Sequence, residues 1–202
     1  MSAITTIRQL FEAQGDDQYF GEDVSQLEHA AQGADLARKG GFDTEVQVAA
    51  FLHDIGHLMP TELEEELMAE YGRKDHEEVA AEWLRAQGFP EKVCILVANH
   101  VNAKRYLTFK NPKYFAGLSE ASLKTLEFQG GPMSAEEAAA FEQNPYFELI
   151  IQMRRWDEAA KVTGLPKPDL EHYLQLCEEV LVWVFPDFKN AFLWFISTKM
   201  TH

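Results

Sequence analysis

Apolar side chains recur every three or four residues along most of the chain, which is the period of amphipathic α-helices. A first stripe runs from Ile4 to Phe11, and a polar, glycine-containing loop follows at residues 15–22. Strand-like alternation is limited to short runs, and residues 111–117 are expected to form an irregular loop. The pattern predicts an all-α fold, with further helices at residues 24–39, 44–54, 75–87, 90–101, 119–127, 134–142, 145–162, 169–184 and 187–197.

The helix that begins at Thr44 is apolar around most of its circumference, because Val46 and residues 48–52 are all hydrophobic. A helix of that kind is buried. It delivers His53 and Asp54 at its C-terminal end. A carboxylate in an apolar setting costs free energy unless it is paired or bound to a metal ion, so this pair is a candidate metal site.

Further candidate ligands also lie within or beside predicted helices, namely His29, His76, His100 and Asp157. Helices of a bundle can direct such side chains at one central point. Imidazole and carboxylate groups bind first-row metals, and six candidates exceed the needs of one tetrahedral zinc ion. A single histidine on an apolar helix is most often a core residue, but that explanation fits the whole set poorly. Because the adjacent Asp54 carboxylate can bridge two ions, we expect a dinuclear site.

Two basic residues accompany these candidates in a chain whose net charge is −15. Lys104 follows His100 by four residues, and Arg154 precedes Asp157 by three, which places each cation on the helix face of a ligand. Together they suit a phosphoryl-type anion, since arginine offers a planar fork and lysine a point charge. The ordinary alternative is a salt bridge to a ligand carboxylate.

Three other polar residues are candidates for contact with a substrate. His57 lies four residues after His53, so the two are expected to share a helix face. We interpret His57 as a substrate contact, although a metal ligand or a hydrogen-bond donor to a ligand has the same pattern. Ser122 and Thr125 lie three residues apart on a predicted short helix. They are either hydroxyl donors to the same anion or exposed helix residues.

Length and composition indicate a single domain, comprising residues 1–202, of which 46% are hydrophobic. The acidic charge argues against nucleic acid and anionic membranes as partners. Cys94 and Cys177 form no redox or metal motif, and the longest apolar run, residues 191–196, is too short to span a bilayer. A cytoplasmic location is therefore expected. The apolar helices from about residue 169 either cover the core or form a subunit interface, so the oligomeric state stays open.

Several segments resemble a known family, and they can be given by their sequence: SQLEH at residues 25–29, FLHDIGH at 51–57, HVNAKRY at 100–106, TLEFQGG at 125–131 and RRWD at 154–157. The order of histidines and aspartates resembles the HD-domain superfamily of helical metalloproteins. His76, His100, Lys104 and the EFQGG segment resemble, more narrowly, the mixed-valent di-iron oxygenases that cleave 1-hydroxyalkylphosphonates. The resemblance spans residues 19–161.

This resemblance implies an HD-type helical bundle around two iron ions, Fe2+ and Fe3+, with dioxygen as co-substrate. The residues that match the ligands of one iron are His29, His53, Asp54 and Asp157. The residues that match the ligands of the other are His76 and His100, with Asp54 as the bridge.

The resemblance also implies roles in substrate binding. The residues that match the phosphonate site are His57, Lys104, Ser122, Thr125 and Arg154, and those implied in catalysis are Asp54, His57 and Lys104. Tyr19 matches a lid tyrosine that occupies an iron before substrate arrives. Glu22 matches a carboxylate that meets the amino group of the substrate.

The implied activity is O2-dependent cleavage of the carbon–phosphorus bond of 1-hydroxy-2-aminoethylphosphonate or its N-trimethylated relative. The products would be phosphate and glycine or glycine betaine. The alternative is a metal-dependent phosphohydrolase of a small phosphoester, which would use the same ligands. A third interpretation is a catalytically silent metal-binding regulator, and the presence of Lys104 and Arg154 beside a complete ligand set counts against it.

Overall fold

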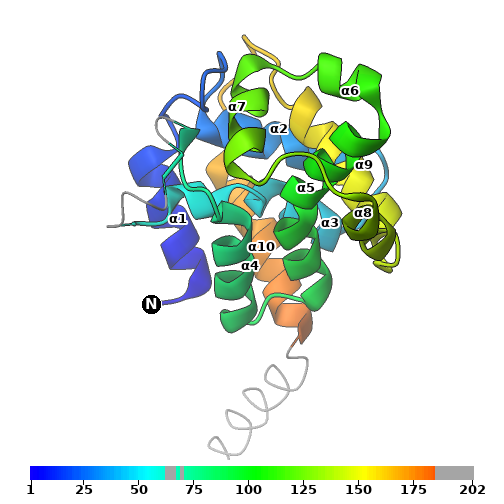
Figure 1. The fold of residues 1–202 in the computed structure, drawn as a ribbon. Helices are drawn as coiled ribbons and strands as arrows, with labels where there is room; N and C mark the ends of the chain where they lie inside the picture. The colour runs from blue at the N-terminus through cyan, green and yellow to red at the C-terminus, as the bar shows by residue number, and fades with distance from the viewer. Residues whose placement is uncertain (62–66, 69–70, 185–202) are drawn as a thin grey trace, which may run out of the picture.

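The computed structural model describes residues 1–61, 67–68 and 71–184, which form ten α-helices and one short 3-10 helix, η1 (Figure 1). The elements are α1 (Ala3–Gln14), α2 (Gln26–Lys39), α3 (Thr44–Leu52), η1 (Ile55–Leu58), α4 (His76–Ala86), α5 (Glu91–Lys110), α6 (Pro112–Ala116), α7 (Glu120–Phe128), α8 (Ala135–Phe141), α9 (Phe147–Ala159) and α10 (Leu170–Val184). The predicted all-α class is confirmed.

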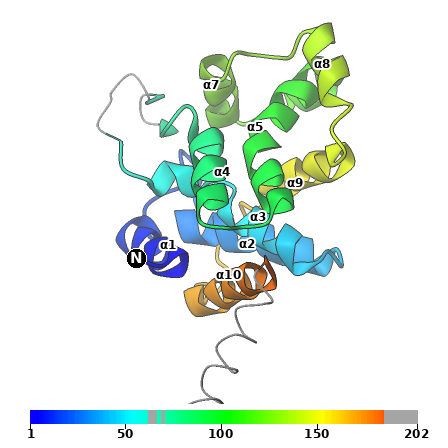
Figure 2. The same ribbon diagram turned by 90° about the horizontal axis from the view of Figure 1, so that it is seen from below.

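Helix α3 lies in the middle of the molecule, and α2, α5 and α10 pack around it (Figure 2). Its apolar sequence explains this position, because Val48, Ala49 and Leu52 are completely buried. Helix α9 packs on α2 and α5, while α4 packs on α5 and η1. The elements that carry the candidate ligands therefore surround a common centre.

Local capping determines where the two central ligand-bearing helices begin. Ser25 forms a capping box with Glu28, so α2 begins directly after Ser25 and His29 lies near its start. The side chain of Asp43 caps α3 by accepting a hydrogen bond from the backbone N–H of Val46. Helix α3 ends at Leu52, and the chain then turns into η1.

The bounds of two predicted segments were wrong. The helix predicted at residues 90–101 continues as α5 to Lys110, because residues 102–110 contain no glycine or proline. Residues 111–117, predicted as irregular loop, contain the short helix α6, which Asn111 caps and Pro112 begins. The helix predicted at residues 187–197 lies outside the described residues.

Helix α10 covers the outer side of α3 and also contacts α1. Tyr173 stacks on Phe51 with ring centroids 4.8 Å apart, and Phe51 stacks on Phe11 at 4.9 Å. This helix therefore buries apolar surface against the bundle. None of the described helices is long and apolar enough to cross a membrane.

Candidate metal centre

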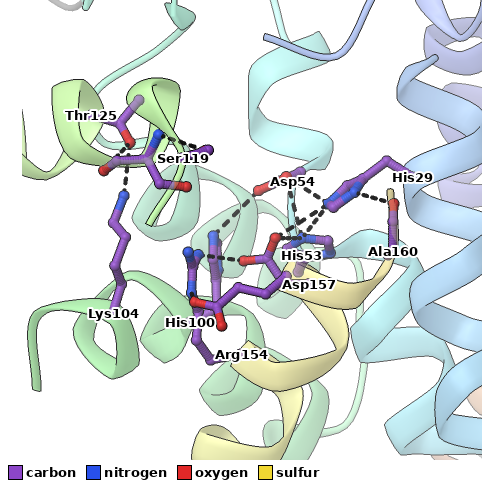
Figure 3. A network of polar contacts seen from close by, with 12 residues as sticks. His29, His53, Asp54, His100, Lys104, Ser119, Thr125, Arg154, Asp157 and Ala160 are labelled. Atoms are coloured by element: carbon purple, nitrogen blue, oxygen red, sulfur yellow. Dashed lines mark hydrogen bonds and ion pairs between the residues drawn. The ribbon is translucent and has the colours of Figure 1, made fainter. Parts of the chain in front are cut away.

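The predicted ligands meet in the middle of the bundle, and Figure 3 shows most of them with their polar contacts. They are His29 of α2, His53 and Asp54 after α3, His76 at the start of α4, His100 of α5 and Asp157 of α9. Each of these side chains belongs to a residue that is at most 8% exposed. The structure thus brings together all the ligands that the sequence suggested.

The Asp54 carboxylate lies between two pairs of histidines. Its Oδ2 atom is 3.5 Å from Nε2 of His29 and 3.2 Å from Nε2 of His53. Its Oδ1 atom is 3.2 Å from Nε2 of both His76 and His100. One carboxylate oxygen therefore faces each pair, which is the arrangement that a carboxylate bridge between two metal ions requires.

The opposite nitrogen of each of these four rings lies beside a backbone carbonyl oxygen, at 2.8–3.0 Å. The carbonyl partners belong, in the order of the ligands, to Ala160, Ala50, Arg73 and Val97. A carbonyl oxygen can only accept, so Nδ1 carries the ring proton and donates it. Once Nε2 has lost its proton, as metal binding requires, each ring has a lone pair on Nε2 directed at the centre.

These lone pairs face one another across short distances. The two Nε2 atoms are 3.2 Å apart in the pair His29 and His53, and 3.0 Å apart in the pair His76 and His100. Unshared lone pairs at such distances repel, whereas a cation between them is coordinated by both. With a backbone carbonyl orienting every ring, the donor set fits two metal ions.

Asp157 completes the first pair, because its Oδ1 atom is 3.5 Å from Nε2 of His29 and 3.9 Å from Nε2 of His53. Burial raises the pKa of Asp157, but the nearby Arg154 charge and the imidazoles of His29 and His53 together outweigh it and hold the pKa well below its usual range. Burial likewise raises the pKa of Asp54, and the facing His53 and other imidazoles lower it well below its usual range. Both carboxylates are therefore anionic at neutral pH, as metal ligands must be.

Arg154 forms the salt bridge that the sequence analysis gave as its ordinary alternative. Its Nη1 donates to Oδ2 of Asp157 at 2.5 Å, and its Nε lies 3.0 Å from Glu158 and 3.1 Å from the hydroxyl of Tyr114. The side chain also lines the cavity in front of the metal centre. Arg154 can therefore orient a ligand and face a bound anion at the same time.

The prediction that His57 shares a helix face with His53 is wrong. Helix α3 ends before His53, and His57 belongs to η1, so the two rings do not stack along one helix. His57 stacks instead on His76, with ring centroids 3.7 Å apart, and ligand atoms of Asp54, His57 and His76 lie within 4.8 Å of one another.

The role of His57 follows from a hydrogen bond to its ring: the backbone N–H of Arg73 donates to Nδ1 at 3.0 Å. Burial and the neighbouring His76 lower the pKa of His57 well below its usual range, so the ring is neutral. A neutral ring with Nδ1 as acceptor carries its proton on Nε2 and has no lone pair left for a metal. His57 is therefore a hydrogen-bond donor that lines the cavity.

Lys104, Ser122 and Thr125 line the same cavity. Lys104 is only 3% exposed, and its Nζ donates to the Thr125 hydroxyl at 2.8 Å (Figure 3). Burial, together with the charge of Arg154, lowers the pKa of Lys104 to about 7. Among the described residues, Lys104 thus has no carboxylate as a hydrogen-bond partner, and an incoming anion would stabilise its charge.

Tyr19 reaches the metal centre from the loop before α2. Its hydroxyl donates to Oδ2 of Asp54 at 2.8 Å, and its ring stacks on His29 with centroids 3.8 Å apart. Glu22 also lines the cavity, and its Oε1 lies 2.6 Å from Nζ of Lys161. The two loop residues that the resemblance assigned to the site are therefore both at it.

Further residues also line the cavity: Phe20 and Gln129, and five that the sequence analysis missed, namely Met68, Tyr71, Val101, Ala121 and Lys161. Lys161 had a usable signal, because it follows Asp157 by four residues, as Lys104 follows His100. The Gln129 Oε1 atom is buried and has no hydrogen-bond partner within the part of the chain that the structure describes. The apolar members carried no signal, because a buried core residue has the same sequence pattern.

Comparison with known proteins agrees with this geometry. The HD domain family matches residues 26–176 of the chain. The [1-hydroxy-2-(trimethylamino)ethyl]phosphonate dioxygenase (glycine-betaine-forming) of Leisingera caerulea is 43% identical over 172 residues, covering 85% of this chain and 87% of that protein. The hydroxymethylphosphonate dioxygenase of Gimesia maris is 44% identical over 172 residues, covering 84% of each.

A third relative is an uncharacterized protein of Acanthamoeba polyphaga mimivirus, 39% identical over 178 residues, which cover 88% of this chain and 81% of that protein. The matches to the two dioxygenases cover most of this chain and most of each relative, so the similarity is not limited to the candidate metal ligands. The chain belongs to the HD domain family, and within it to the group that contains these phosphonate dioxygenases.

Proposed function

We propose that the protein is a metal-dependent dioxygenase that cleaves the carbon–phosphorus bond of a 1-hydroxyalkylphosphonate. The observation that carries this proposal is the position of the Asp54 carboxylate: each of its two oxygens faces one pair of histidines. The carboxylate lines a cavity that Lys104 and Arg154 also line. The names of two extensive relatives support the same reaction class.

We further propose that the two metal ions are iron. Imidazole and carboxylate ligands suit iron as well as zinc, but zinc has no redox chemistry with dioxygen. Bound iron would supply the redox chemistry, and a mixed Fe2+/Fe3+ pair is the state implied by the family resemblance. The ligands of one ion would be His29, His53, Asp54 and Asp157, and those of the other would be Asp54, His76 and His100.

The protein's own side chains would bind and orient the phosphonate. Lys104 and Arg154 offer positive charge, and His57 offers an Nε2–H donor from a ring that stays neutral. The hydroxyls of Ser122 and Thr125 line the same wall of the cavity. Charge-assisted hydrogen bonds of this kind fix a dianionic group in one orientation, which holds C1 at the metal centre.

The proposed reaction balances without an external reductant. One dioxygen accepts four electrons from the substrate, the C1–H and C1–P bonds are broken, and C1 becomes a carboxylate. Phosphate and one proton are released with it. Tyr19 would have to leave Asp54 before a substrate oxygen could approach the same face, because its hydroxyl lies 2.8 Å from Oδ2.

The substituent beyond C1 is the part of the substrate in which the two named relatives differ. One acts on a trimethylamino compound and the other on hydroxymethylphosphonate. The family resemblance of Glu22 favours an amino or trimethylammonium group there, with glycine or glycine betaine as the product. The substrate is in each case a small phosphonate.

The alternative function is hydrolysis of a small phosphoester at the same metal centre, and the two dioxygenase relatives favour the oxygenase over it. The test is to load the purified protein with iron, supply 1-hydroxyphosphonates, and follow oxygen uptake and phosphate release together. We expect one oxygen to be consumed for each phosphate formed, and poor activity on phosphate monoesters, which lack the C1–H bond next to phosphorus. Equal phosphate release under strict anaerobiosis would reverse the assignment.

A further inference from the structure

A salt bridge stands at the wall between the active-site cavity and a second cavity. Nζ of Lys161 lies 2.6 Å from Oε1 of Glu22, and each side chain is 20% exposed. Both residues line the active-site cavity of about 50 Å³ and also an adjoining cavity of about 290 Å³. The pair is 139 residues apart in sequence, so it joins the loop before α2 to the segment after α9.

Glu22 is the natural partner for a positively charged substrate tail. Among the described residues, the only other carboxylates that line the active-site cavity are Asp54 and Asp157, which face the metal centre. A quaternary or primary ammonium group is recognised by an opposite charge and by the face of an aromatic ring. A site for such a tail therefore needs the Glu22 carboxylate and a nearby ring.

The ammonium group of Lys161 already interacts with the Glu22 carboxylate and with an aromatic ring. It is bonded to Glu22, and it lies 5.9 Å from the centroid of the Tyr19 ring, within cation–π range. A cationic tail would have to displace this ammonium from Glu22 and would meet its positive charge at short range. A substrate with nothing beyond C1 leaves the pair intact.

We propose that Lys161 competes with a cationic substrate tail for Glu22 and thereby determines tail selectivity. This inference rests on the proposed phosphonate dioxygenase function and deepens it. Lys161 thereby reduces the preference that Glu22 gives to a cationic substrate over hydroxymethylphosphonate.

The test compares two substrates on the iron-loaded protein: hydroxymethylphosphonate and 1-hydroxy-2-(trimethylamino)ethylphosphonate. The measured quantity is the ratio of their kcat/KM values, cationic over tail-free, from oxygen uptake. Lys161→Gln should raise this ratio about tenfold, mainly through KM for the cationic substrate, since it removes a like charge and frees Glu22. Lys161→Arg retains the charge and should leave the ratio near its original value.

Two further variants separate this effect from general changes in charge. Lys92→Gln removes an equivalent salt bridge, because Lys92 lies 2.6 Å from Asp43 with its side chain 21% exposed, outside the cavity. It should leave the ratio unchanged. Adding Glu22→Gln to Lys161→Gln should abolish the gain for the cationic substrate, because the freed carboxylate is then absent.

An unchanged ratio in Lys161→Gln would overturn the inference, and so would an equal rise in Lys92→Gln. If the unaltered protein consumes oxygen with neither phosphonate, the proposed function itself fails. In that case, calorimetry under anaerobic conditions measures how tightly each compound binds, and the ratio of the two affinities, cationic over tail-free, replaces the kinetic ratio. A tenfold shift of that ratio in Lys161→Gln would support the competition, and no shift would refute it.

Discussion

Replacing Gly56 with alanine offers a sharp test of how the second histidine pair is positioned. Gly56 lies in η1, which packs against the start of α4. A Cβ atom on Gly56 would be 2.0 Å from the carbonyl oxygen of His76, 2.7 Å from its carbonyl carbon and 2.9 Å from its Cα. These are backbone atoms of a ligand residue, so no side-chain rotation can relieve the overlap.

The size of the required movement follows from these distances. Real Cβ contacts lie at 3.0 Å or more, so the backbone of His76 has to move away by at least about 1 Å. Misplacement of a catalytic group by 1 Å can cost about a hundredfold in rate. Overpacking of a core also costs about 1–3 kcal/mol of unfolding free energy. Because the overlapping atoms all belong to His76, we expect the ligands His29, His53 and Asp157 to keep their places.

We therefore expect Gly56→Ala to fold, to bind one metal ion tightly and the second weakly, and to lose at least about a hundredfold in kcat. Metal content per chain, far-UV circular dichroism and oxygen uptake measure these three outcomes. Gly117→Ala is the matched control, since Gly117 has a negative φ of −96° and a Cβ there would approach nothing closer than 3.4 Å. Two metal ions per chain and full activity in Gly56→Ala would show that this close approach does not hold His76 in place.

Four other predictions concern the same centre. Asp54→Ala should lose both metal ions, as measured by metal analysis, and with them all activity. His172→Ala changes an exposed residue and should keep both ions and the activity. Two bound ions in Asp54→Ala would contradict the proposed bridge. Arg154→Ala should weaken metal binding by about 10–100-fold in equilibrium dialysis, because Asp157 loses the partner that orients it, and unchanged affinity would limit Arg154 to the substrate. Lys104→Ala should retain both metals and weaken phosphonate binding by about 1.5–3 kcal/mol, seen as a higher KM. The pKa of Lys104 is about 7, so its charged form is present below pH 7 and lost above it; kcat/KM should therefore fall as pH rises through this value, and Lys104→Arg should remove that fall.

The sequence was informative about the ligands because their chemistry is local. A histidine and an aspartate at the end of a largely apolar helix predict a buried polar site wherever the helix packs, and the other candidate ligands lie within or beside predicted helices that can meet at one centre. The positions of Lys104 and Arg154 followed from helical spacing alone, because both pairs lie within single helices, α5 and α9.

Contacts between distant segments were beyond that reasoning. His57 was placed on the wrong element, because no pattern marks the change from α3 to η1 within the run FLHDIGH. The pairing of Glu22 with Lys161 depends on how the end of α9 approaches the loop before α2. The requirement for glycine at position 56 depends on the approach of η1 to α4, which only three-dimensional packing defines.

The carbonyl partners of the four histidines have a consequence for how the protein is made. His53, His76 and His100 each donate to the carbonyl oxygen three residues earlier, so their rings are oriented as soon as their own turns form. The ring of His29 is oriented by Ala160, which lies 131 residues later in the chain. During synthesis on the ribosome, the rings of His76 and His100 can therefore be oriented early. The pair of His29 and His53 is completed only after α9 has emerged, because α9 and the residue after it bring Asp157 and Ala160 to that pair.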